Sequence, residues 1–273
     1  MPQVFAVEDP DDPRLEPYRA VRERDLVGRQ GFFVAEGRVV LEKAIAADPA
    51  ALVSALVAAH RLESLADVLA GLPDDTPVFA AGQAVMDKVV GFPIHRGVLA
   101  VGRRRLRDPA DLLAGLPARA LVVGLVGIAN HDNMGGVFRN AAAFGADAVL
   151  LDDTCCDPLY RKAIRVSVGA ALTTPFARAG SAGDLVAMLE VAGFETVALS
   201  PRGALELRDL HPGPRRAALF GAEGPGLPDD ILTRTTSVRI AMAGGFDSLN
   251  VATTSGIVLH QLAFAERRVE TRG

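Results

Sequence analysis

The chain has 273 residues, 49% of them hydrophobic and 23% charged, with a formal net charge of −4. This composition is typical of a globular protein with apolar residues for two cores, and the acidic balance disfavours a passive nucleic-acid coat. No uncharged apolar run reaches about 18 residues and the N-terminus has no secretory pattern, so we expect no membrane span and a cytoplasmic location. The adjacent cysteines Cys155 and Cys156 predict reduced thiols, without a disulfide or a metal site.

The first part of the chain alternates between the two kinds of secondary structure. Short apolar runs predict strands at 31–35, 52–58, 77–80 and 97–101. Helices are expected at 13–24, 38–47 and 83–90. The alternation predicts a small α/β domain over residues 1–102.

Residues 103–117 are charged at first and then contain Pro109, Gly115 and Pro117, which predicts a linker. A second domain is expected over 118–273. Its predicted strands are 120–126, 148–151, 196–199, 217–220 and 237–240, and its predicted helices are 134–144, 159–168, 182–192 and 248–265. This order predicts an α/β fold with a mostly parallel sheet and helices on both faces.

Three consecutive strands of that sheet end in candidate ligand loops. The loops are Ser200–Gly203, Gly221–Pro228 and Ala241–Asn250. Parallel sheets bind ligands beyond the carboxyl ends of their strands, and loops of small residues let a flat ligand meet backbone amides. The Gly221–Gly226 segment fits neither a P-loop nor a dinucleotide-binding fingerprint, and a tight turn with positive φ at Gly226 is the alternative to a ligand site.

Three polar residues, two of them in these loops, are candidates for a functional role. Glu223 is a carboxylate flanked by small residues at a strand end. Asn250 lies in the expected first turn of an apolar helix, which Asp247 or Ser248 would cap. Asn133 is in turn expected to cap the helix that follows it.

Basic residues lie on two of the predicted helices. Arg139 follows the glycine pair Gly135–Gly136 on an otherwise apolar helix, where a salt-bridged surface arginine is the alternative to a functional one. Arg161, Lys162 and Arg165 lie on the next predicted helix, where they predict either a solvated face or contacts to RNA phosphates.

Three blocks occur in a fixed order along the chain, namely Asn133–Arg139, Ala218–Pro228 and Ile240–Ala252. Together they resemble the SPOUT superfamily, specifically the SpoU/TrmH-type RNA ribose 2′-O-methyltransferases, over about residues 120–265. The resemblance implies a SPOUT domain with a deep trefoil knot and a homodimer whose knot faces meet, with an RNA site composed from both subunits. The Gly31–Gly37 segment resembles the L30e-like substrate-binding domain found ahead of many such domains.

The resemblance also implies a reaction and its residues. S-adenosylmethionine would donate a methyl group to a ribose 2′-OH of structured RNA, with rRNA slightly favoured over tRNA. Arg139 would be the central catalytic residue, with Asn133, Glu223 and Asn250 orienting the target. A guanidinium is always protonated in proteins, so Arg139 fits charge stabilisation better than proton abstraction.

The cofactor pocket implied by the resemblance combines backbone groups of the loops with apolar side chains. Its residues are Leu199, Ser200, Gly203, Phe220, Gly221, Ala222, Glu223, Gly226, Ile240, Met242, Ser248, Leu249 and Asn250. RNA contacts are implied for Arg139, Arg161, Lys162 and Arg165.

The chain departs from the family pattern at His131-Asp132, where Pro-Gly is common, and at Asn140, where Thr is frequent. These changes put the choice of target and the local loop shape in doubt. Two other functions stay open: a non-catalytic RNA-binding or assembly protein with the same fold, and a SPOUT base methyltransferase. A nicotinamide dehydrogenase is disfavoured, because no Gly-x-Gly-x-x-Gly turn follows the first strand of the second domain.

Overall fold

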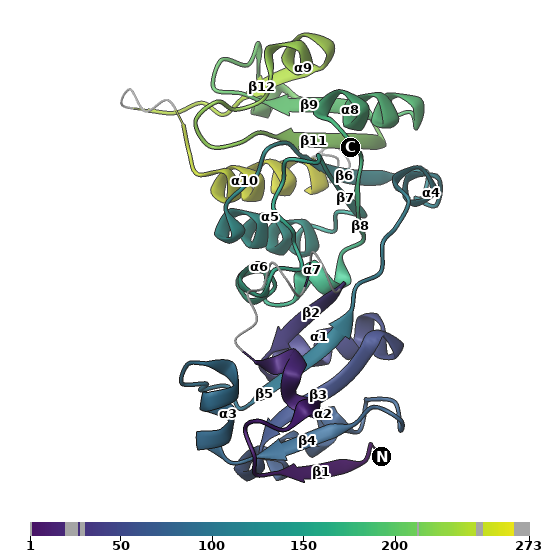
Figure 1. The fold of residues 1–273 in the computed structure, drawn as a ribbon. Coiled ribbons are helices and arrows are strands. Elements are labelled where there is room, and N and C mark those ends of the chain that lie inside the picture. The colour runs from purple at the N-terminus through teal and green to yellow at the C-terminus, as the bar shows by residue number, and fades with distance from the viewer. Residues whose placement is uncertain (1, 20–26, 28–30, 212, 244–247, 265–273) are drawn as a thin grey trace. The chain divides into compact units, whose positions relative to one another are not determined.

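The computed structural model describes residues 2–19, 27, 31–211, 213–243 and 248–264. The chain forms two compact units (Figure 1). The first unit consists of Met1–Arg105 together with Asp157–Thr173, and the second of Leu106–Cys156 together with Thr174–Gly273. None of the helices in the described ranges is long and apolar enough to cross a bilayer.

The first unit is built on a five-stranded sheet in the order β1-β4-β3-β5-β2. The strands are β1 (Val4–Val7), β2 (Phe32–Glu36), β3 (Leu52–Ala58), β4 (Val78–Ala81) and β5 (Val98–Arg103). β5 runs antiparallel to both of its neighbours, and β1, β4 and β3 are parallel. All four predicted strands are confirmed, and β1, an edge strand of only four residues, was not predicted.

Helices pack on this sheet. The predicted helices at 38–47 and 83–90 are confirmed as α1 (Arg38–Ala47) and α3 (Gln83–Val90), and a short α2 (Ala66–Leu69) was not predicted. In place of the predicted helix at 13–24 the chain forms a 3₁₀ helix, η1 (Pro13–Tyr18), which contains Pro17; residues 20–24 lie outside the described residues. Leu15, Tyr18 and Met86 are buried in one core with apolar residues of β3, β4 and β5.

The second unit contains a seven-stranded sheet in which every neighbouring pair is parallel, in the order β10-β12-β9-β11-β6-β7-β8. The predicted strands are confirmed as β6 (Ala120–Leu125), β7 (Ala148–Leu151), β9 (Glu195–Leu199), β11 (Arg215–Phe220) and β12 (Thr236–Arg239). Two short edge strands were not predicted, β8 (Phe176–Arg178) and β10 (Leu205–Glu206). The predicted α/β class with a mostly parallel sheet is confirmed.

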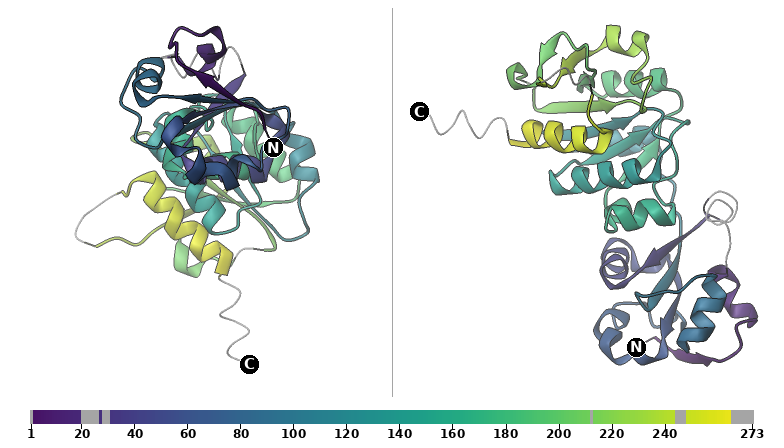
Figure 2. Two further views of the ribbon diagram at one scale, coloured as in Figure 1. Left: turned by 90° about the horizontal axis from the view of Figure 1, so that it is seen from below. Right: turned by 90° about the vertical axis from the view of Figure 1, so that its left-hand side faces the viewer.

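Helices cover both faces of this sheet. Three of the four predicted helices are found here as α5 (His131–Ala143), α8 (Ala182–Val191) and α10 (Val251–Phe264), and α9 (Asp229–Arg234) is additional. The fourth, predicted at 159–168, is found as α6 (Arg161–Val166), which belongs to the first unit. Leu185, Leu189 and Ile231 of α8 and α9 enter a core with β6, β7 and β11. On the other face α5 and α10 lie side by side (Figures 1 and 2).

The division between the units differs from the predicted one in two ways. Residues 103–117, predicted as a linker, hold the last residue of β5 and a helix, α4 (Pro109–Ala114), which Asp108 caps and whose Leu113 is buried in the core of the second unit. The segment Asp157–Thr173, which carries α6 (Arg161–Val166) and α7 (Ala170–Thr173), lies between β7 and β8 in sequence but packs with the first unit, against β2 and α1.

Candidate active site

The three candidate ligand loops follow strands that are direct neighbours. β12, β9 and β11 are adjacent and parallel, so the loops after Leu199, Phe220 and Arg239 begin at the same edge of the sheet. β6, the next strand along, leads at that edge into α5. The loop after Arg239 is described only in part, because residues 244–247 lie outside the described ranges. The topology therefore brings the expected loops together.

Backbone packs directly on backbone in two of these loops. A Cβ atom on Gly221 would lie 2.3 Å from the carbonyl carbon of Gly226, and one on Gly203 would lie 2.3 Å from that of Val238. The Gly221 loop closes on itself through a hydrogen bond from Gly226 N to Ala222 O, 3.0 Å long. The positive φ predicted for Gly226 is confirmed at 73°. Only glycine fits at positions 203 and 221, because any side chain would collide with main-chain atoms.

Three polar side chains from separate parts of the chain meet at this edge. Asn133 Nδ2 donates to Glu223 Oε1 at 2.6 Å, and Asn250 Nδ2 donates to the same oxygen at 3.1 Å and to Asn133 Oδ1 at 2.8 Å. We call these three residues the polar triangle. One carboxylate oxygen thus takes two amide donors, which keeps both side-chain amides in a fixed orientation.

The helix starts around the triangle differ from the predicted ones. The cap of α5 is Asn130, whose side chain accepts from the backbone N–H of Asp132 and of Asn133, so the prediction that Asn133 caps the helix is wrong. Asn133 instead lies buried in the first turn, which turns its side chain toward Glu223. The cap of α10 is Asn250 itself, whose Oδ1 accepts from Ala252 N at 2.9 Å and Thr253 N at 3.3 Å. Of the caps predicted there, Ser248 is not the capping residue and Asp247 lies outside the described residues.

Arg139 is an exposed cation. Its residue is exposed on α5, and within the described residues its guanidinium makes no hydrogen bond or ion pair. The alternative of a salt-bridged surface arginine therefore does not describe it. A helix turns about 100° per residue, so Arg139 lies about 120° around α5 from Asn133, on a different face.

Asn140, noted in the sequence only as a departure from the family pattern, joins α5 to α10. Its Nδ2 donates to Ala252 O at 2.6 Å and to Ser255 Oγ at 2.9 Å. Ser255 is fully buried, and a Cβ on Gly136 would lie 2.6 Å from the Cβ of Ala252. The small residues bring the two helices close, and Asn140 fixes α10 two residues after Asn250. Sequence reasoning missed this role because it depends on a partner more than a hundred residues away.

Asp152 is a second residue that sequence reasoning missed. Its buried carboxylate accepts from Gly127 N at 3.1 Å, Cys155 N at 3.0 Å and the Thr154 hydroxyl at 2.7 Å. These bonds fix the loop between β6 and α5 against the end of β7. Cys155 Sγ in turn accepts from Ile128 N, and burial raises the pKa of the Cys155 thiol to about 12, so it is an unreactive thiol at neutral pH.

The predicted cofactor-pocket side chains differ in exposure. Phe220 is buried in the core, with 1% exposed, whereas Leu249 is 42% exposed and Leu199, Ile240 and Met242 are half-buried. Ser200 Oγ accepts from Arg202 N at 3.3 Å and so shapes its own loop.

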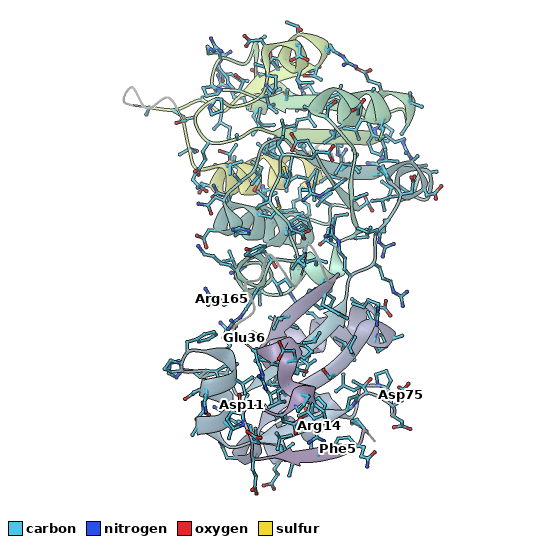
Figure 3. All side chains as sticks on the ribbon, viewed as in Figure 1. Phe5, Asp11, Arg14, Glu36, Asp75 and Arg165 are labelled. Carbon is cyan, nitrogen blue, oxygen red and sulfur yellow. The ribbon has the colours of Figure 1, made fainter. Side chains whose placement is uncertain are left out.

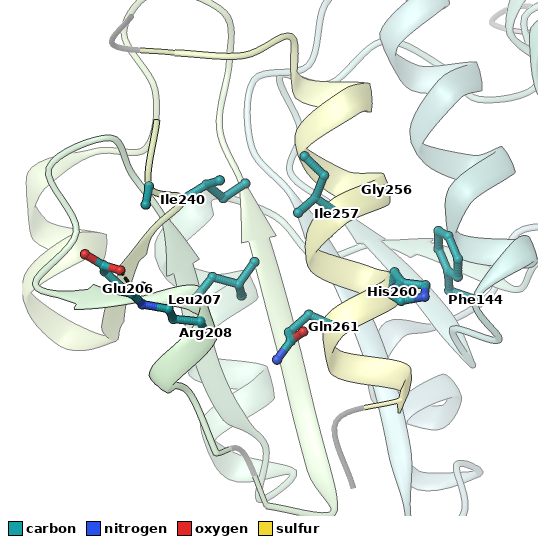
Figure 4. A pocket seen from close by; sticks show the side chains of 10 residues that line it. Phe144, Glu206, Leu207, Arg208, Ile240, Gly256, Ile257, His260 and Gln261 are labelled. Carbon is teal, nitrogen blue, oxygen red and sulfur yellow. Dashed lines mark ion pairs between the residues drawn. The ribbon is translucent and has the colours of Figure 1, made fainter. Parts of the chain in front are cut away.

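A groove of about 540 Å³ lies beside these loops, along α10 (Figure 4). It shares Ile240 with the predicted pocket. The other lining residues are Phe144, Glu206, Leu207, Arg208, Ala241, Gly256, Ile257, His260 and Gln261.

The predicted RNA contacts fall into both units. Arg139 belongs to the second unit, and Arg161, Lys162 and Arg165 belong to the first. Arg161 is only 18% exposed and is bound to the buried Glu36, with Nη2 and Nε at 2.9 and 3.0 Å from Glu36 Oε2. Its guanidinium therefore has a structural partner, whereas Lys162 and Arg165 are exposed. In the described part of the chain no group of three or more His, Cys, Asp or Glu side chains is arranged to hold a metal ion.

Comparison with known proteins defines the class. Residues 120–260 match the family model described as the SpoU rRNA methylase family. An uncharacterised tRNA/rRNA methyltransferase of Mycobacterium bovis is 41% identical over 266 residues, which cover 93% of this chain and 89% of the relative. The chain therefore belongs to the SpoU family of RNA methyltransferases, as the three sequence blocks predicted.

Solved structures agree with this assignment. An AdoMet-bound rRNA methyltransferase from Sinorhizobium meliloti is similar in fold, with a TM-score of 0.82 at 23% identity over 96% of this chain and 98% of its own. An RNA 2′-O ribose methyltransferase is 26% identical, with a TM-score of 0.79 over 96% of this chain and 99% of its own. S-adenosylmethionine, the cofactor predicted from the sequence, is the methyl donor of this family.

Proposed function

We propose that this protein methylates a ribose 2′-OH of structured RNA, with S-adenosylmethionine as the donor and rRNA as the favoured substrate. The observation that carries the proposal is the polar triangle, in which Asn133, Glu223 and Asn250 from three separate segments orient one another beside the backbone-walled loops. The name of the 26% identical solved structure supports the ribose 2′-OH as the target.

The loops fit this cofactor. Leu249, Ile240 and Met242 leave apolar surface partly exposed at the strand ends, which the flat adenine ring would cover. In the Gly221–Pro228 loop the Cβ positions of Gly224 and Gly226 are open, so the backbone there would be accessible to the edge of that ring. When bound, the cofactor supplies an electrophilic methyl group on a sulfonium.

The residues of the chain then position the nucleophile. In the proposed reaction the ribose oxygen would form a bond to the methyl carbon as the bond from that carbon to sulfur breaks, and the hydroxyl proton would leave to solvent. Alignment of two reactants can account for about 7–11 kcal/mol of a barrier. Asn133 and Asn250 would hold the ribose, and Arg139 would stabilise the developing negative charge or the neighbouring phosphate, because a guanidinium does not act as a base at neutral pH.

A homodimer would complete this site. Arg139 is exposed on a different face of α5 from the triangle, which supports a site in which Arg139 of one subunit serves the triangle of the other. The same proposal includes a trefoil knot at the cofactor loops, an L30e-like first unit and a cytoplasmic location.

Methyl transfer from labelled S-adenosylmethionine to separate pools of unmodified rRNA and tRNA tests the reaction. We expect label in one pool, at a nucleotide that resists alkaline cleavage, and loss of the label with Arg139→Ala. Arg234→Ala, an exposed arginine of the same unit paired with Glu190, is the matched control and should keep full activity. Label at an alkali-sensitive nucleotide would favour base methylation. No label and no calorimetric binding of the cofactor would favour a non-catalytic RNA-binding protein.

Mixing two inactive variants tests the shared site. After Arg139→Ala and Glu223→Ala subunits are unfolded and refolded together, half of the dimers carry one of each, and one of their two sites is intact. We therefore expect about a quarter of the wild-type activity. Activity no greater than the sum of the two variants would place Arg139 and the triangle in the same subunit.

A further inference from the structure

Two arginines lie across glycines at one edge of the sheet of the first unit. Gly37 has a φ of 91°, and a Cβ on it would lie 2.8 Å from Arg96 Cδ. Gly97 has a φ of 68°, and a Cβ on it would lie 2.9 Å from Arg61 Cγ. Because neither glycine has a side chain, the aliphatic part of each arginine can pack directly on the glycine backbone.

The two glycines are neighbours across the strands. Gly37 N donates to Val98 O at 3.0 Å, at the end of β2 and the start of β5. Ala58 N donates to Gly97 O at 2.9 Å, at the end of β3. β3, β5 and β2 are adjacent in the sheet, so Arg61 and Arg96 lie near each other at the same edge.

Neither guanidinium is neutralised. Among the residues described, Arg61 and Arg96 make no ion pair and no side-chain hydrogen bond, and both are exposed. His60 and His95, next to them in sequence, are exposed as well. Two exposed cations without carboxylate partners leave guanidinium groups whose hydrogen-bond donors are open to an anionic ligand.

Four carboxylates in this part of the first unit already have partners, and Glu63, exposed two residues after Arg61, pairs with neither arginine. Glu36, at the end of β2 (Figure 3), binds Arg161, and Asp87 accepts from Gln83 Nε2 at 2.8 Å and from Ile94 N at 2.9 Å. Glu42 and Asp67 both bind Arg38. These acids hold the surrounding loops and helix in place, and none of them pairs with the two free arginines.

An exposed aromatic ring adjoins the cations. Phe92 is 38% exposed, and the guanidinium carbon of Arg161 lies 4.4 Å from the centre of its ring. Arg161 is anchored by Glu36, which directly precedes Gly37, so the ring, the stacked arginine and the two free arginines belong to one surface. A planar ring among fixed cations matches an unpaired RNA base and its adjacent phosphates better than it matches an acidic peptide.

We propose that this surface, formed by Arg61, Arg96 and the Arg161–Phe92 pair and named here the arginine edge, binds the backbone of the RNA substrate. Arg61 and Arg96 contact neighbouring phosphates, and Phe92 stacks on an unpaired base. The inference rests on the proposed function, because it takes the bound polymer to be the RNA that is methylated.

The test compares a double variant, Arg61→Gln with Arg96→Gln, against Arg105→Gln. Arg105 is an exposed arginine of the same unit, paired with Asp48 beyond the other ends of β5 and α1, so the control removes charge from the opposite edge of the sheet. Binding of a fluorescent, unmodified rRNA transcript is measured by anisotropy from about 50 to 200 mM salt, a range in which phosphate contacts change affinity strongly. Methyl transfer to the same transcript gives kcat and KM, and calorimetry gives the Kd for S-adenosylmethionine.

For the double variant we expect Kd and KM for RNA to rise about tenfold and the slope of log K against log salt to fall by about 1.4, with about 0.7 per phosphate contact. The kcat and the Kd for the cofactor should not change. Arg105→Gln should leave the RNA Kd and KM close to the wild type. Phe92→Leu should weaken binding without changing the salt slope, because stacking releases no counterions.

An unchanged Kd and salt slope in the double variant would overturn the proposal, and so would a fall in kcat at constant KM. The paired Arg61→Lys, Arg96→Lys variant keeps the charges and should keep the slope, which separates a lost contact from a misfolded unit. If the wild type transfers no methyl group but the double variant loses RNA binding, the arginine edge stands and the proposed reaction fails.

Discussion

Glycines beside strand ends have different roles in the two sheets. In the second unit, Gly203 and Gly221 follow strand ends and bring main chain within 2.3 Å of where a Cβ would be. In the first unit, Gly37 and Gly97 flank strand ends, and the nearest atoms belong to arginine side chains at 2.8 and 2.9 Å. A glycine beside a strand thus gives either a wall of backbone or a support for a cation, and its neighbour in space decides which.

The polar side chains at these two sheet edges also differ: those of the second unit pair with one another, and those of the first unit do not. The triangle of the second unit satisfies its own hydrogen bonds, since Glu223 accepts from both asparagines. The arginine edge of the first unit leaves Arg61 and Arg96 without partners among the described residues. A self-satisfied site suits precise orientation of small reacting groups, and unpaired cations suit a polyanion that brings its own charge.

The largest effect is expected where the triangle loses its acceptor. Glu223→Ala leaves the amides of Asn133 and Asn250 without the oxygen that orients them, so kcat should fall by roughly 10²–10³, the range for loss of one preorganised group. Affinity for RNA should stay within about twofold. Steady-state kinetics and anisotropy on one transcript measure both quantities. Glu190→Ala, which removes an exposed acid on α8, is the control and should keep full activity. A loss of RNA affinity in Glu223→Ala as large as its loss of kcat would contradict the difference in role between the two edges.

A matched pair of glycine variants tests the contrast directly. Gly221→Ala forces a Cβ into main chain and should destabilise the second unit by about 1–3 kcal/mol and weaken cofactor binding at least tenfold. Gly37→Ala meets only the flexible stem of Arg96, although its φ of 91° adds strain, and should weaken RNA binding alone. Calorimetry with cofactor and anisotropy with RNA separate the two outcomes. Loss of cofactor binding in Gly37→Ala would contradict the assignment of separate tasks.

Much of the fold follows from local patterns. Buried strands of the second unit such as β6 and β7 are continuous apolar runs, and their parallel order follows from the helices between them. The missed elements are short or at edges, as with β1 and β10, where few residues carry the pattern. The packing of Asp157–Thr173 with the first unit could not be predicted, because it depends on contacts such as Arg161 with Glu36, far apart in sequence.

The sequence predicted which loops form the candidate site, but it did not predict the hydrogen bonds between their side chains. Strand order alone brings the loops after β9, β11 and β12 to one edge. The cap positions were mispredicted because asparagine is favourable at a cap and also as an amide partner, and Asn130 competes with Asn133 for the cap of α5. The unpaired state of Arg61 and Arg96 has no local signal at all, since it depends on where every nearby acid points.

A smaller effect is expected at the junction of α5 and α10. Asn140→Ala removes the donor to Ala252 O and to the buried Ser255, which should cost about 1–2 kcal/mol of stability. Because Asn250 caps the start of α10, kcat should also fall by about fivefold while KM for RNA stays the same. Thermal unfolding and steady-state kinetics measure the two effects. Asn140→Gln, which can reach one of the two acceptors, should recover part of kcat; a loss of stability with full kcat would limit Asn140 to packing.

The smallest effect, and the one of opposite sign, is expected at Val168. Val168 follows the end of α6 with a φ of 53°, and it is the only described residue other than glycine with a positive φ. Gly169 N donates to Ile164 O and Val168 N to Arg165 O, the bonds of a helix end at which glycine or asparagine is preferred. Val168→Asn should therefore raise the stability of the first unit by about 1 kcal/mol, because a branched side chain is costly in the left-handed region. Calorimetric unfolding measures the gain, and Val168→Ala is the control. Equal gains from both variants would attribute the strain to the branched side chain alone, and no gain from either would mean that the bonds of this turn already compensate for it.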